Sequence, residues 1–214
     1  MNMTSEYARK ALADADATAK ATRLVSAMAG ADMIVMMWGV IWFTGFMWSH
    51  FVAAYGWPNV YHALWFPLVG AGVACTILFE MRRTAPVRNL ADKRIGYFWW
   101  AMYGYYFLGY LIVSPYLSHA LLNSTPDGAK AIAAINTIVP MFAYVVMGLW
   151  LEQRHFICAG LGLTALTCLA YFVFNPIFFP FMAIVGGSML FGFGLWMRMC
   201  WMVAARRLGQ HVNV

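Results

Sequence analysis

Charged side chains are missing from four long stretches of this sequence, and this absence constrains the fold more than any other feature. Asp, Glu, Lys and Arg do not occur in residues 33–79, 95–126, 131–151 or 155–197. A helix needs roughly 20 apolar residues to cross about 30 Å of bilayer hydrocarbon, and charges inside that layer are costly and rare. The four stretches therefore predict a protein that lies in a membrane.

Turn-forming residues divide the first and last of these stretches. Gly56 and Pro58 interrupt the first, and Asn175 with Pro176 interrupts the last. The pattern predicts an all-α bundle of six transmembrane helices at 32–54, 60–81, 96–118, 131–151, 156–175 and 180–204. The composition fits, because 63% of the residues are hydrophobic and only 10% are charged, against about a quarter charged in soluble domains.

Basic residues set the expected orientation, because Lys and Arg are retained on the cytoplasmic side during insertion. Of the 14 Lys and Arg residues, six spans place only Lys130 on one side and all the others on the opposite side. We therefore expect both termini to be cytoplasmic, in a cell membrane of the bacterial inner-membrane kind. The net charge of +6 then favours anionic lipid headgroups as partners, and no soluble domain is left that could bind nucleic acid.

The spans divide the chain into three regions: an amino-terminal segment, 1–30, a transmembrane domain, 31–207, and a cytoplasmic tail, 208–214. The first segment is rich in Ala and carries Glu6 and Lys10 four residues apart, which favours a helix. Its apolar face is thin. Such a helix would lie on the membrane surface, pack on a partner subunit or form a solvated stalk.

A weak internal similarity relates two of the predicted hairpins. The first and third spans end in Ser followed by His50 or His119, and the second and fourth end in Glu80 or Glu152 followed two residues later by Arg. A duplicated pair of helices keeps its orientation, so this pattern would be a parallel repeat about an axis along the membrane normal. Chance similarity between two hairpins is the alternative.

Polar side chains within the spans are candidates for lining a cavity. Tyr103, Tyr106 and Tyr110 follow at i, i+3 and i+7, which places three phenols on one face of a helix. Asn136 and Thr44 are further polar side chains in other spans. Together they would line a cavity for a neutral, aromatic or cationic small molecule. The alternative is that their polar groups bond to backbone carbonyls of the bundle.

Four ionisable residues are expected near the cytoplasmic boundary: Asp32, Glu80, Glu152 and Arg198. A carboxylate paired with Arg198 would be either a structural ion pair or an inner gate. No carboxylate or Lys is expected at mid-bilayer, which argues against a proton-driven pump.

Three histidines are expected near the opposite face: His50, His62 and His119. Neutral imidazoles bind copper, zinc and haem iron, so these residues are the candidate metal site, and haem or copper the candidate cofactor. Their spacing does not require a metal, since His50 and His62 flank a turn rather than share a helical face. The alternative is interfacial histidines bonded to water and loop carbonyls.

The sequence leaves three classes of function open. It lacks a phosphate-binding Gly-rich loop, an HExxH motif and a G-x-S-x-G motif, so an enzyme is not the expected class. We expect a transporter or binding protein for a small molecule in an aromatic-lined bundle. The alternatives are a non-catalytic subunit or scaffold of a membrane complex and a metal or haem redox protein. Glycines in the spans favour close helix contacts, including those of an oligomer.

Overall fold

The computed structural model describes residues 5–28, 31–56, 61–82, 96–105, 108, 126–150 and 152–212. Almost all of these residues lie in helices, and none of them lies in a strand. The prediction of an all-α protein is therefore confirmed for the described part of the chain.

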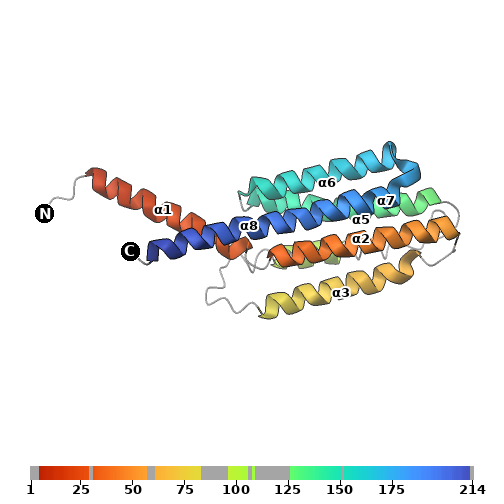
Figure 1. Ribbon diagram of the computed structural model, residues 1–214, viewed down its shortest axis with the longest axis horizontal. Helices are drawn as coiled ribbons and strands as arrows, with labels where there is room; N and C mark the ends of the chain where they lie inside the picture. The colour runs from red at the N-terminus through yellow and green to blue at the C-terminus, as the bar shows by residue number, and fades with distance from the viewer. Residues whose placement is uncertain are drawn as a thin grey trace.

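The helices of the bundle run side by side along its long axis, and both chain ends lie beyond the same end of it (Figure 1). An additional helical stretch covers 96–105. The named elements are α1 (Ser5–Met28), α2 (Ala31–Tyr55), α3 (Tyr61–Arg82), α5 (Pro126–Trp150), α6 (Arg154–Phe172), the 3-10 turn η2 (Asn175–Ile177), α7 (Phe178–Phe181), the π-helical turn η3 (Met182–Gly186) and α8 (Gly187–Val212).

Among the described residues, four helical segments are long and apolar enough to cross a membrane: Ala31–Tyr55, Gly128–Trp150, Arg154–Phe172 and Asn175–Val203. They coincide with the first, fourth, fifth and sixth predicted spans. The second predicted span coincides with α3, whose apolar part is the shorter segment Leu64–Phe79. Most of the third, 96–118, lies outside the described residues. The structure thus supports a membrane protein with four membrane-length helices.

Helix α2 is the centre of the packing, since it contacts α1, α3, α7, η3 and α8. Its closest approach is to α8. A Cβ atom on Gly39 would lie 2.6 Å from the backbone nitrogen of Phe191, and one on Gly194 would lie 2.8 Å from the carbonyl oxygen of Asp32. The two backbones are therefore in direct contact, as small residues allow in membrane helices.

Trp65 of α3 packs on a glycine of α2. The indole of Trp65 covers Gly45, where an added Cβ would lie 2.6 Å from the ring. Its Nε1 donates a hydrogen bond of 2.9 Å to the Ser49 hydroxyl, which donates one of 3.0 Å to the Gly45 carbonyl. The ring of Phe46 meets the same indole edge-on at 5.2 Å. The indole of Trp65 thus makes its hydrogen bond and its apolar ring contacts at the same site on α2.

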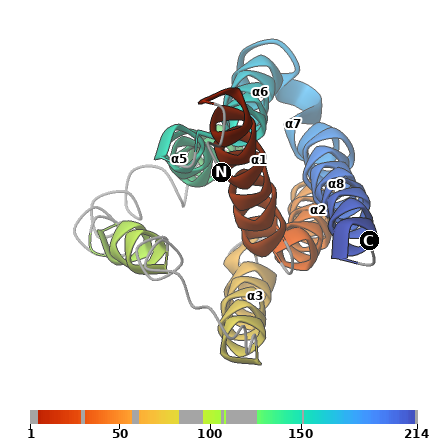
Figure 2. The same ribbon diagram turned by 90° about the vertical axis from the view of Figure 1, so that its left-hand side faces the viewer.

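Aromatic rings also join the pair α5 and α6 to the pair α2 and α8, which Figure 2 shows end-on. The ring centroid of Phe156 of α6 lies 5.9 Å from that of Tyr144 of α5 and 5.7 Å from that of Phe193 of α8. Towards the other end, Phe178 of α7 contacts both Phe46 and Tyr171 at 6.3 Å. These edge-on and tilted contacts form much of the buried core.

The backbone contact predicts a selective effect of alanine on stability. Gly39→Ala places a methyl group against the backbone of α8, so the helices must separate, and overpacking of this kind costs about 1–3 kcal/mol. Gly192→Ala is the control on α8, because a Cβ there meets nothing within 4 Å and alanine favours a helix. Thermal unfolding in mild detergent should show a lower Tm for Gly39→Ala only. Equal shifts in the two variants would contradict the close contact.

Candidate functional site

The predicted cavity residues have separate environments where the structure describes them. Thr44 donates a hydrogen bond of 2.9 Å to the Val40 carbonyl of its own helix. Asn136 lies on an exposed part of α5. Tyr103 stacks on Trp99 in the helical stretch 96–105, with ring centroids 5.7 Å apart. Tyr106 and Tyr110 lie outside the described residues, so a cavity shared by all five stays a prediction.

The contacts of Trp99 attach the stretch 96–105 to α5. Its ring meets Tyr144 edge-on at 5.8 Å, and its Nε1 donates a hydrogen bond of 3.3 Å to the sulfur of Met147. Tyr103, which stacks on the Trp99 ring, is only partly buried. The structure thus presents a tyrosine and a tryptophan as one aromatic surface beside α5.

Two of the four predicted inner-face residues lie at the interface of α2 and α8. Asp32 is 2% exposed, and its Oδ2 accepts a hydrogen bond of 3.3 Å from Nε1 of Trp201. Arg198 donates one of 3.4 Å from Nη1 to the sulfur of Met33. The Asp32 carboxylate on α2 and the Arg198 guanidinium on α8 therefore lie at the same part of the interface between these two helices. Whether they form an ion pair or a gate stays a prediction.

Of the remaining two predicted inner-face residues, Glu80 and Glu152, the structure describes the side chain of Glu152 alone. Glu152 is exposed in the turn between α5 and α6, and its φ of 54° is the left-handed conformation that glycine usually supplies at a helix end. Two backbone bonds accompany it, from Glu152 to the Leu149 carbonyl and from Gln153 to that of Gly148. Glu152 therefore ends α5, a role that sequence reasoning missed. The side chain of Glu80 lies outside the described residues.

The proposed metal ligands are described at one position only. His50 is half-buried on α2, with its ring 5.8 Å from that of Phe51. The side chains of His62 and His119 lie outside the described residues. Among the side chains that are described, no group of three or more His, Cys, Asp or Glu is placed to hold a metal ion. The histidine site stays a prediction.

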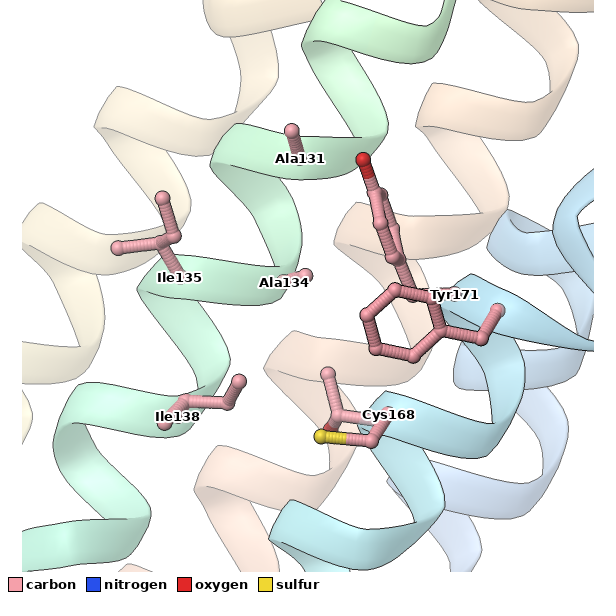
Figure 3. A pocket seen from close by; sticks show the side chains of 8 residues that line it. Ala131, Ala134, Ile135, Ile138, Cys168 and Tyr171 are labelled. Carbon is pink, nitrogen blue, oxygen red and sulfur yellow. The ribbon is translucent and has the colours of Figure 1, made fainter.

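The structure contains a groove between α5 and α6 that sequence reasoning missed (Figure 3). Its volume is about 240 Å³, and its lining is almost wholly apolar. The lining residues are Ala131, Ala134, Ile135, Ile138, Thr167, Cys168, Tyr171 and Phe172. The lining residues from α5 recur at i, i+3, i+4 and i+7, a pattern that marks one face of a helix. The pattern does not indicate which neighbouring helix leaves a groove beside that face. Of the predicted cavity residues that the structure describes, Thr44, Tyr103 and Asn136, none lines this groove.

Hydroxyl groups within the helices bond to their own backbones. Thr137, Thr164 and Thr167 each donate to the carbonyl four residues earlier, at 2.8–2.9 Å. Among the described side chains, no buried nitrogen or oxygen lacks a hydrogen-bond partner. The interior therefore offers a ligand mainly apolar and aromatic surface, which suits binding by shape and by contact with rings.

A comparison with protein-family models found no match to this chain, and comparisons with curated proteins and with solved structures found none either.

Proposed function

We propose that this chain is a six-span protein of the bacterial inner membrane with both ends in the cytoplasm. Four membrane-length helices support the spanning part of this proposal, and α3 matches a fifth predicted span. The orientation rests on the charge distribution, since Lys130 is the sole basic residue assigned to the outer side. The two chain ends lie beyond the same end of the bundle (Figure 1), as this topology requires.

Thiol labelling tests the topology. The four native cysteines are first replaced by serine, and then Tyr55→Cys, Arg9→Cys and Arg154→Cys are made singly at exposed positions. A membrane-impermeant maleimide added to intact cells should label Tyr55→Cys at once, and the other two only after permeabilisation. Labelling of Arg154→Cys and Tyr55→Cys from the same side would overturn the six-span topology.

For the function, we infer a non-catalytic subunit or scaffold of a larger membrane assembly. The observation that carries this inference is a helical arm formed by α1 and the last part of α8, which extends beyond the bundle (Figure 1). The helix from Phe178 to Val212 is roughly 50 Å long at 1.5 Å per residue. It therefore exceeds the hydrocarbon layer of about 30 Å, and its end stands beside α1, which packs against it.

The exposed surface of α1 is suited to contact with another protein. Between residues 6 and 19, every side chain that the structure describes is exposed. Tyr7 and Leu12 are 65% and 73% exposed, among side chains that include Glu6, Arg9 and Asp14 of both charge signs. Burying the two apolar side chains against a partner is favourable at about 25 cal/mol per Å². The mixed charges would select the partner.

The size of the native assembly tests this function. Membranes from the native host are solubilised in mild detergent, and the protein is sized on a native gel beside the same chain made in an unrelated host. We expect the native protein to migrate as a larger species, and Tyr7→Ser with Leu12→Ser to shift it to the size of the lone chain. Ala8→Ser with Ala15→Ser, also at exposed positions of α1, is the matched control and should not shift it.

Migration of the native protein as a lone chain, or equal shifts in both double variants, would refute a role for α1 in assembly.

The aromatic pair of Trp99 and Tyr103 favours transport of a small molecule as a second candidate function. Stacked rings that are only partly buried attract cations and flat apolar molecules through their π faces. Together with Tyr106 and Tyr110, which share a helical face with Tyr103 in the sequence, they would form the wall of a passage for an aromatic cation.

Uptake of ethidium, an aromatic cation, by proteoliposomes tests this second candidate. Tyr→Leu at all of Tyr103, Tyr106 and Tyr110 removes the phenols from the proposed wall, and we expect uptake to fall about tenfold or more, because a cation–π contact contributes up to about 2 kcal/mol. Tyr105→Leu is the control, since Tyr105 is 78% exposed. Uptake no faster than in empty liposomes, or undiminished in the triple variant, would remove the transport proposal.

A further inference from the structure

We propose that the π-helical turn η3 is a hinge about which the helix pair α5 and α6 rocks relative to the pair α2 and α8. The chain passes from α6 to α8 through three short elements in a row, η2, α7 and η3. Figure 2 shows the two pairs end-on, with α7 between α6 and α8. This inference goes beyond both proposed functions and depends on neither of them.

Within each pair, glycine allows the two helix backbones to touch. In α5 and α6, a Cβ on Gly160 would lie 2.6 Å from the Met141 carbonyl oxygen, and one on Gly148 would lie 2.7 Å from the backbone nitrogen of Ile157. The backbone contact at Gly39 joins α2 and α8 in the same way. Backbones packed this closely resist sliding and tilting, because every shift opens a void or causes a clash. We therefore expect each pair to move as one body.

The contacts that join α6 to α8 are of another kind. The rings of Phe156 and Phe193 meet edge-on, and a Cβ on Gly162 would lie 2.9 Å from the terminal methyl group of Met189. Ring edges and a flexible thioether adapt to a small displacement by changes of rotamer. This interface therefore permits a motion that the backbone contacts within each pair oppose.

The backbone hydrogen bonds of η3 indicate how the hinge moves. The amide of Gly187, directly after η3, is shared among the carbonyls of Met182, Ala183 and Ile184. These carbonyls lie five, four and three residues earlier, and they are the acceptors of a π-turn, an α-turn and a 3-10 turn. Because the amide already lies near all three acceptors, the turn can bend while this amide keeps a hydrogen bond. A change of angle between α7 and α8 thus has a low cost at this point.

Small residues add backbone freedom at the same place. Gly186, Gly187 and Ser188 follow one another, and helices bend sharply at π-turns and at pairs of Gly and Ser. A Cβ on Gly186 would lie 3.3 Å from the terminal methyl group of Met182, which is the flexible end of a side chain in the same turn. Gly186 therefore accepts alanine, which makes it the position at which the hinge can be tested.

Distances between spin labels test the hinge. The four native cysteines are replaced by serine, and Leu195→Cys on α8 is combined in turn with Phe51→Cys on α2 and with Leu169→Cys on α6, all at exposed positions. Double electron–electron resonance on the full chain in lipid nanodiscs then compares a distance within one pair with a distance across η3. We expect a narrow distribution within α2 and α8 and a broader or split one across η3. Two equally narrow distributions would overturn the hinge.

Gly186→Ala distinguishes η3 from other sources of motion. Alanine favours the helical backbone over glycine by roughly fivefold, so the population of the minor distances across η3 should fall by about that factor. The distance within α2 and α8 should stay the same. Gly192→Ala is the control on the same helix, because a Cβ there meets nothing within 4 Å, and it should change neither distribution.

An undiminished width across η3 in Gly186→Ala, or an equal narrowing in both alanine variants, would place the motion elsewhere and refute the hinge. The comparison of the two distances in the chain with native Gly186 decides the proposal even if Gly186→Ala fails to fold.

Discussion

Direct contact between the backbones of α2 and α8 is the constraint on which the rest of the bundle depends. Lipid tails are as apolar as leucine, so helices in a membrane gain little from hydrophobic burial against each other and associate through close van der Waals contact. Gly39 on α2 with Gly187 and Gly194 on α8 permits that contact, because a Cβ at any of them would meet atoms of the other helix within about 3 Å. With α2 held in this way, its remaining faces receive Trp65 from α3 and the rings of α7. The helices thus approach each other most closely where their side chains are smallest.

The extent of the membrane helices was accessible from the sequence, because it depends on local composition. The predicted boundaries at 32–54 and 156–175 lie within a few residues of α2 and α6, since charge and turn residues alone mark where a helix leaves the hydrocarbon. The π-helical turn and the groove were not accessible. Both depend on how residues far apart in the chain fit together, and many registers of neighbouring helices are compatible with one pattern of apolar residues.

The candidate site residues show the same division. Sequence reasoning placed Asp32 and Arg198 near one boundary, and the structure puts them on adjoining helices, because depth in a membrane follows from position along a span. The role of Thr44 was less accessible. A threonine hydroxyl in a helix either bonds back to its own carbonyl or points to a neighbour, and its rotamer decides which. The bond from Thr44 to Val40 belongs to the first kind, and nothing in the residue type distinguishes the two.

The π-helical turn makes the helix from Phe178 to Val212 sensitive to its length in residues. Buried residues occur there in adjacent pairs, Phe178 with Phe179, Met182 with Ala183, and Gly186 with Gly187, repeating every four positions. In an α-helix of 3.6 residues per turn, each such step overshoots by about 40°, so the wider turn of η3 keeps the pairs facing the same neighbours. Deleting one residue would rotate α7 by about 100° relative to α8. This segment therefore tolerates exchange of one amino acid for another more readily than insertion or deletion. The number of residues in it constrains its evolution more than the identity of each residue does.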